Sequence, residues 1–221
     1  MQELVIAGMA ALAGKVAYDI AGPLAKELGE MLKEEVQPYR APRRKRLLEK
    51  TAAMLRDGEI RAHAVPGRIL FPILEYASHE DDDDLHSKWA ALLAHAASVD
   101  GAESYPTVFT AILSELSPRE VLLLDTLLRQ LFVELKGKEM RKYGARHPIS
   151  PRPVDDIVLA KFPGELPYQV AHDHLSQRGL MRYAAPDENK KFTFYYLTTL
   201  GLEFTAACQP PPKAQREMTE R

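Results

Sequence analysis

Residues 78–120 read SHEDDDDLHSKWAALLAHAASVDGAESYPTVFTAILSELSPRE, and this stretch decides the fold class of the chain. Ser78 followed by the acidic run Glu80–Asp84 is typical of a helix start, because the helix dipole stabilises carboxylates in the first turn. The apolar residues that follow recur at helical spacing: Leu85, Trp89, Leu92, Leu93 and Ala96. The pattern predicts a buried helix with Trp89, the only tryptophan, as the anchor of its core.

The end of the stretch predicts the longest apolar helix. Ser117 and Glu120 have the spacing of a capping box, and the proline between them suits the first helical turn. Apolar residues then continue at helical spacing to Leu135. Two more apolar regions are expected to be helical, one just before the stretch and one within it. In residues 65–77, Pro66 and Pro72 would each begin a short helix, and residues 104–116 would form another.

The composition narrows the classes of function. The 221 residues hold 29 basic and 31 acidic side chains, so the net charge of -2 gives no overall attraction for nucleic acid or anionic membrane. Cys208 is the only cysteine, which excludes an intrachain disulfide and fits a cytoplasmic protein. Glycine-rich phosphate loops and zinc-type spacings are absent from the sequence, so we expect no cofactor.

The N-terminal stretch, residues 4–21, is apolar but contains Lys15 and Asp19. Charged residues are costly in lipid, so a helix packed on the protein or on a second subunit is favoured over reversible membrane insertion. The candidate membrane or oligomer contacts are Leu4, Val5, Ile6, Met9, Leu12 and Val16. Gly22 and Pro23 break this helix, and an amphipathic helix is expected over residues 24–36.

The densest basic cluster is the turn at residues 40–46, ahead of a third helix. Its candidate nucleic-acid contacts are Arg43, Arg44, Lys45 and Arg46. Such a cluster can contact phosphates, but no aromatic residues are interleaved with it, as many nucleic-acid sites require. A solvated face, or pairing with the acidic run Glu80–Asp84, is therefore the favoured interpretation.

A metal site is the alternative interpretation of the acidic run. On a helix, His79, Asp82, Asp83 and His86 would share one side, which permits metal binding but matches no known signature. A helix start explains the acids more simply. We assign no metal ligands and no catalytic residues.

The C-terminal third predicts small alternating elements. A linker is expected at 136–153, helices at 154–162, 167–178 and 198–208, and strands at 180–185 and 191–197. With 117–135 as first helix, this order resembles a winged-helix domain. The chain also ends in a pattern similar to many such domains, formed by Leu197, Thr198, Leu200, Gly201 and Phe204.

The helix at 168–178 would be the counterpart of a recognition helix. Its expected apolar residues are Val170, Ala171 and Leu175, and its expected exposed residues are Gln169, His172, Asp173, Ser176 and Gln177. The exposed face is nearly neutral, so protein contact is favoured over DNA reading, to which the wing would add Arg182, Lys190 and Lys191. His172 and His174 are two positions apart, about 200° around a helix, so they do not converge on a metal.

Four segments carry a family resemblance: residues 23–56, 65–78, 85–97 and 105–127. In order and pattern they resemble the abortive infection alpha family of bacterial proteins, over most of residues 1–135. The resemblance implies a role in phage defence, in which an infected cell stops growing or dies. The family offers no established active-site residues to carry over.

Together these observations predict a mainly α protein, with a multi-helix N-terminal array and a small winged-helix-like α+β C-terminal domain. The expected divisions are 1–36, 37–116, 117–208 and a disordered tail at 209–221. We expect a non-enzymatic defence effector or sensor that acts as a homo-oligomer, on another defence protein or on a membrane. A winged-helix nucleic-acid-binding regulator is the alternative. A toxin-like nuclease using His86 or Asp83 is the third hypothesis.

Overall fold

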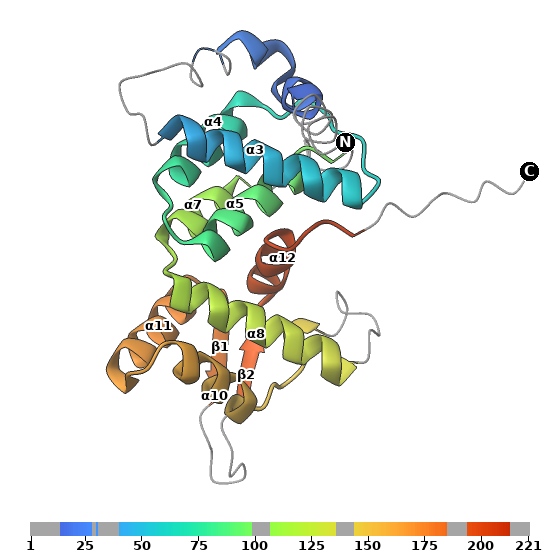
Figure 1. Ribbon diagram of the computed structural model, residues 1–221. Coiled ribbons are helices and arrows are strands. Elements are labelled where there is room, and N and C mark those ends of the chain that lie inside the picture. Colours follow the sequence, from blue (N-terminus) through green and yellow to red (C-terminus); the bar gives the residue numbers. More distant parts are fainter. Residues whose placement is uncertain are drawn as a thin grey trace, which may run out of the picture. The chain divides into compact units, whose positions relative to one another are not determined.

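The computed structural model describes residues 14–27, 30, 40–98, 107–135, 144–184 and 194–212. The described chain is mainly helical, with one small antiparallel sheet near the C-terminus, as the sequence predicts (Figure 1). It divides into two compact units, residues 1–114 with 207–221, and residues 115–206. The finer divisions expected from the sequence stay predictions.

The first unit contains a short 3-10 helix and four α-helices whose ends the structure defines. They are η1 (Gly22–Leu24), α3 (Arg40–Asp57), α4 (Gly67–His79), α5 (Asp83–Ala96) and α7 (Val108–Glu115), of which α7 ends at the unit boundary. Helix α3 packs against both α4 and α5. The hydroxyl of the fully buried Thr51 on α3 lies 3.2 Å from the carbonyl oxygen of Ala90 on α5, and alanines on α5 allow this close approach.

Trp89 lies at the centre of this core, as predicted. Its side chain is 2% exposed and stacks on Tyr76 of α4, with 5.6 Å between ring centroids and 13° between ring planes. Burial of an indole of this size removes a large apolar surface from water, and offset stacking adds to that stabilisation. Trp89 therefore joins α5 to α4.

Three local predictions in this unit are wrong. Pro72 lies inside α4 rather than at the start of a second helix. Ser78 is buried near the end of α4, where its hydroxyl donates to the Glu75 carbonyl, so it does not cap α5. Asp82 caps α5 instead, because its carboxylate accepts a hydrogen bond from the Leu85 amide at 2.9 Å. The basic cluster forms the first turns of α3 rather than a turn before it.

The second unit begins with α8 (Pro118–Leu135), whose predicted capping box is confirmed. Glu120 accepts a hydrogen bond from the Ser117 amide at 2.7 Å, and the Glu120 amide lies 3.4 Å from the Ser117 hydroxyl. Helices α10 (Pro151–Lys161) and α11 (Glu165–Gln177) pack on α8. The remaining elements are η2 (Gly144–Arg146), β1 (Met181–Ala184), β2 (Phe194–Leu197) and α12 (Thr199–Ala207).

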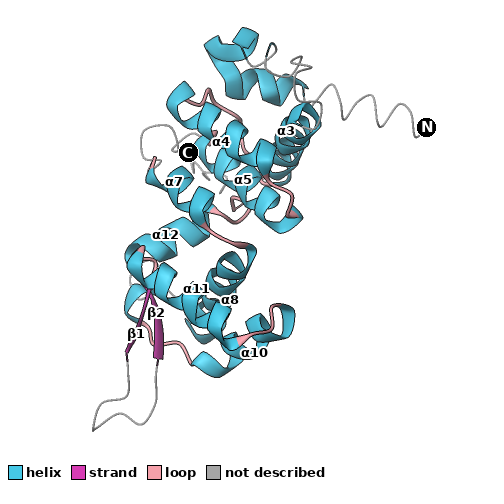
Figure 2. Cartoon of the chain, turned by 90° about the vertical axis from the view of Figure 1, so that its left-hand side faces the viewer, coloured by secondary structure: helices cyan, strands magenta, loops and turns pink. Residues whose placement is uncertain are grey.

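The two strands form an antiparallel hairpin, in which Met181 pairs with Leu197 and Ala184 with Phe194 (Figure 2). Ile149 extends the sheet through an isolated bridge to Tyr195 and is completely buried. The predicted linker at 136–153 is therefore structured from residue 144 onward, and α10 begins at Pro151 within it. Pairing with β2 explains why apolar Ile149 lies in an otherwise polar segment.

The start of α12 approaches Leu180 so closely that only glycine fits at position 201. A Cβ atom there would lie 1.8 Å from the Leu180 carbonyl oxygen. Thr198 fixes the approach, since its hydroxyl donates to the Gly179 carbonyl at 2.5 Å and accepts from the Gly201 amide at 2.9 Å. The Thr-x-x-Gly part of the C-terminal pattern is thus a joint between the hairpin and α12.

The predicted break after the first helix is confirmed at Gly22, which has a φ of +50° and begins η1. Val16 is half-buried within a helical stretch, residues 14–21. The other five N-terminal contact candidates, Leu4, Val5, Ile6, Met9 and Leu12, lie outside the described residues, as does most of the expected amphipathic helix. In the described part of the chain, no helix combines the length and apolar character needed to cross a membrane.

Candidate functional site

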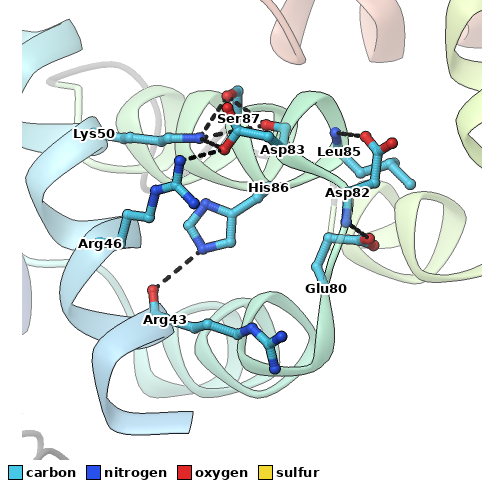
Figure 3. A network of polar contacts seen from close by, with 9 residues as sticks. All are labelled: Arg43, Arg46, Lys50, Glu80, Asp82, Asp83, Leu85, His86 and Ser87. Atoms are coloured by element: carbon cyan, nitrogen blue, oxygen red, sulfur yellow. Dashed lines mark hydrogen bonds and ion pairs between the residues drawn. The ribbon is translucent and has the colours of Figure 1, made fainter. Parts of the chain in front are cut away.

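A polar network joins α3 to the start of α5 (Figure 3). Lys50 of α3 donates hydrogen bonds to the Asp83 carboxylate at 2.7 Å and to the Ser87 hydroxyl at 2.8 Å. Arg46, one turn earlier on α3, also pairs with Asp83 at 2.7 Å. Two cations therefore converge on one carboxylate at the N-terminal end of α5.

The remaining basic residues of the cluster also have acidic partners. Arg43 pairs with Asp81. Arg40 and Arg44 both pair with Glu75 of α4. Lys45 lies 4.0 Å from Glu49, one turn along the same helix. The expected pairing between the basic cluster and the acidic run is confirmed at Asp81 and Asp83.

Helix dipoles explain why the two charge runs face each other. Positive side chains at the start of α3 interact unfavourably with the positive end of its helix dipole, and nearby carboxylates offset this repulsion. The carboxylates themselves sit where the dipole of α5 favours them, with Asp82 as its cap and Asp83 and Asp84 in its first turn. The ion pairs thus offset the unfavourable positive charge at the start of α3 and fix the register of α3 on α5.

The pKa values of two carboxyl groups reflect this pairing. The hydrogen bond from Lys50 lowers the pKa of Asp83. Partial burial acts to raise the pKa of Glu75, but hydrogen bonds from Arg40 and His79 outweigh it and lower that pKa. Both groups are therefore held in their charged form in the folded protein.

The candidate metal ligands are separated by the structure. His79 belongs to α4, where it lies 3.3 Å from Glu75, whereas His86 on α5 lies 3.2 Å from the Arg43 carbonyl oxygen. Burial lowers the pKa of His86, so its imidazole is neutral at physiological pH. Asp82 and Asp83 have the capping and ion-pair roles described above. Across the described ranges, no three His, Cys, Asp or Glu residues are arranged to hold a metal ion.

The candidate nucleic-acid contacts differ in exposure. Arg44 is almost fully buried, with 5% of its side chain exposed, whereas 57% of Arg46 and 72% of Lys45 are exposed. The Arg182 guanidinium lies over the Tyr196 ring, 5.0 Å from its centroid. Lys190 and Lys191 lie outside the described residues. Nucleic-acid binding by these residues stays a prediction.

A second polar cluster lies inside the other unit, and sequence reasoning missed it. Asp155 of α10 accepts hydrogen bonds from the hydroxyls of Tyr168 on α11 and Tyr195 on β2. His172 packs between the two tyrosine rings, at centroid distances of 4.6 and 4.7 Å. Because its expected exposure rested on helical periodicity alone, the burial of His172 corrects that expectation.

His174 faces a different network, so the expected divergence of the two histidines is confirmed. Its Nδ1 lies 2.5 Å from a carboxylate oxygen of Glu120, which is buried at the start of α8. Arg178 extends the chain of contacts to His174 and to Glu115. These contacts attach α11 to the first turn of α8, using the carboxylate that also closes the capping box.

The outer face of α11 carries an exposed apolar pair. Leu166 is 71% exposed and Val170 is 59% exposed, one turn apart on the same helix. The expectation that Val170 faces the core is therefore wrong, although Ala171 and Leu175 are buried as expected. Exposed Glu165, Gln169 and Asp173 lie alongside the pair, and we call these five residues the α11 outer face.

The two units thus define a mainly helical protein whose polar side chains are largely used in contacts between its own helices. The family model described as abortive infection alpha matches residues 41–208, and the chain belongs to this family. The match confirms the resemblance seen in the sequence and extends it through the second unit. No curated protein and no solved structure matches the chain.

Proposed function

We propose that this chain is a bacterial phage-defence protein of the abortive-infection type, and that it works through protein contact rather than through catalysis. The match to the abortive infection alpha family over residues 41–208 carries the proposal of defence. A cytoplasmic location, with membrane association as a variant of it, belongs to the same proposal.

Contacts within the fold support a non-enzymatic role. The residues best suited to chemistry are used to hold helices together: Asp83 binds Lys50 and Arg46, and His174 binds Glu120. The exposed α11 outer face, in contrast, contributes little to the core and is free to contact another molecule, either a second copy or another defence protein.

A winged-helix nucleic-acid-binding regulator is the alternative function. The order α8, Ile149, α10, α11, β1 and β2, with Ile149 and β1 both paired to β2, supports it. The charge of α11 weighs against it, since Glu165 and Asp173 on the exposed face would repel phosphate.

Inducible expression in a bacterium, with and without phage, tests the proposal. Survival, membrane potential and nucleic-acid integrity are measured together after infection. We expect the protein to reduce phage yield while host nucleic acid stays intact in uninfected cells. Degradation of nucleic acid upon expression alone would contradict the non-enzymatic role, and unchanged phage yield would contradict the role in defence.

Binding assays on the purified protein test the alternative. A DNA- or RNA-binding regulator would show salt-sensitive binding that weakens in an Arg46→Gln, Arg182→Gln variant. Absence of binding to duplex DNA and to RNA at low salt would exclude this function.

A further inference from the structure

The α11 outer face has an apolar centre that the fold does not use. Leu166 and Val170 occupy adjacent turns, and both are more than half exposed. Valine is also a weaker helix former than most residues found on exposed helix surfaces. Neither core packing nor helix stability therefore explains an exposed valine at position 170.

Two carboxylates, Glu165 and Asp173, lie beside this pair. Among the described residues, neither Glu165 nor Asp173 forms an ion pair, and Glu165 accepts only a long hydrogen bond, 3.4 Å, from Gln169. The helix dipole favours a carboxylate at Glu165, in the first turn. It does not favour one at Asp173, in the C-terminal half of the helix.

The acids of the first unit provide the contrast. Glu75, Asp81 and Asp83 each have an arginine or lysine partner from α3. The two basic residues that flank the α11 outer face in sequence contact other groups: Lys161 lies over the Phe162 ring, 5.6 Å from its centroid, and Arg178 is paired with Glu115. The face thus combines exposed apolar side chains with two carboxylates that lack a cationic partner in the described part of the chain.

We propose that the α11 outer face is a docking surface for a basic amphipathic helix of a partner protein. Leu166 and Val170 would contact the apolar side of that helix, and Glu165 and Asp173 would pair with lysines or arginines beside it. This is the arrangement by which helices recognise one another through anchors one turn apart. The inference rests on the proposed function in protein contact and names the chemistry of the partner.

Charge argues against the other two occupants. A symmetric contact with a second copy would bring the acidic rows of two identical faces together, because such an interface uses the same patch twice. Duplex DNA would place phosphates against Glu165 and Asp173. With a basic partner, in contrast, both carboxylates would make attractive electrostatic interactions.

Two synthetic peptides provide the probe for the full-length protein. Both are amphipathic helices with the same leucine face, one with lysines and one with glutamates on the polar side. We expect the lysine peptide to bind, measured by fluorescence anisotropy, with an affinity that falls as salt increases. The glutamate peptide should bind at least about tenfold more weakly.

Variants locate the binding. Leu166→Ser with Val170→Ser should weaken the lysine peptide at least about tenfold, and Glu165→Gln with Asp173→Asn should weaken it and flatten its salt dependence. The matched control is Phe132→Ser with Val133→Ser, an exposed apolar pair on α8, which should leave binding unchanged. Equal losses in the control, or no loss in the α11 variant, would overturn the proposal.

Two further measurements use the same proteins. If sedimentation shows that the wild type is a dimer and that the Leu166→Ser, Val170→Ser variant is a monomer, the face binds a second copy and the proposal is overturned. Duplex DNA binding lost in that variant would overturn it equally. Phage protection is scored separately, so lysine-peptide binding without protection by the wild type would leave the surface assigned and contradict only the proposed function.

Discussion

At the scale of single residues, Gly201 shows how a short sequence pattern encodes a contact. A side chain at this position would collide with the Leu180 carbonyl oxygen, which accepts a hydrogen bond from the Thr198 amide at 3.0 Å. We expect Gly201→Ala to lower the free energy of unfolding by about 2–3 kcal/mol, since the backbone must shift to admit a methyl group. Thermal and urea unfolding followed by circular dichroism measure the change.

Gly14 is the matched control for that substitution. It is exposed in a helical stretch, and a Cβ atom there would meet nothing within 4 Å. Gly14→Ala should be neutral or stabilising by up to about 1 kcal/mol, through helix propensity. Equal effects of the two substitutions would show that the close approach at Gly201 does not exist in solution.

His172 makes the second unit sensitive to acid. Burial lowers the pKa of its imidazole, although the Asp155 and Asp173 carboxylates act in the opposite direction. Its Nε2 is buried without a hydrogen-bond partner, and the tyrosines beside it, Tyr168 and Tyr195, direct their hydroxyls to Asp155. The folded state therefore favours the neutral ring.

The sign of the pH dependence follows from that shift. The pKa of His172 in the folded protein lies below the unfolded value of about 6.5. Its neutral ring therefore contributes fully to the free energy of unfolding above that pH, and this contribution decreases as the pH falls below it. Because His86 and His95 shift in the same direction, His172→Phe should reduce this acid loss without abolishing it. Melting temperatures at pH 7.5 and 5.5 measure it. An unchanged difference between the two temperatures would contradict the role of His172.

At the scale of elements, the start of α5 depends on one cap. The Asp82 carboxylate accepts a hydrogen bond from the Leu85 amide and so caps the N-terminus of this helix. Asp82→Ala should lower the free energy of unfolding by about 1 kcal/mol, and Asp82→Ser should restore most of it. Asp156→Ala, which removes an exposed carboxylate from the interior of α10, is the control and should cost clearly less. Urea titration compares the three variants.

The elements also show which predictions a sequence supports. The capping box at Ser117 and Glu120 is local, so spacing alone predicts it correctly. Ser78 and Pro72 were assigned wrongly because local preferences for helix starts compete with the packing of one continuous α4. The burial of His172 and exposure of Val170 depend on where α8 and the hairpin cover α11, which periodicity does not specify.

At the scale of the whole molecule, many of the charged residues that could act in a functional site pair with one another within the fold. The carboxylates and cations that suggested a metal or nucleic-acid site in the sequence are joined across α3, α4 and α5. Opposite charge runs predicted their pairing, but not that Arg44 would be buried in it. The α11 outer face was missed because the helix was expected to begin at residue 167, which leaves out Leu166, and because Val170 was grouped with Ala171 and Leu175.

Substitutions at Asp83 and at the α11 outer face distinguish a defence protein that acts by protein contact from a toxin-like enzyme. Asp83→Asn keeps an oxygen that can accept from Lys50 but removes the charge. Since most of the Asp83 side chain is exposed, the loss of stability should stay below about 1 kcal/mol. If the protein acts by contact, phage protection should persist in this variant and be lost in Leu166→Ser, Val170→Ser, with both variants folded.

Plating efficiency of phage, together with circular dichroism of the purified variants, decides between the two. A folded Asp83→Asn protein without protection would assign Asp83 a chemical role, because its ion pairs are too exposed to account for complete loss through stability. Protection retained in the α11 variant would move the effector surface elsewhere. Loss confined to the α11 variant would show that defence depends on an exposed face that the fold itself does not need.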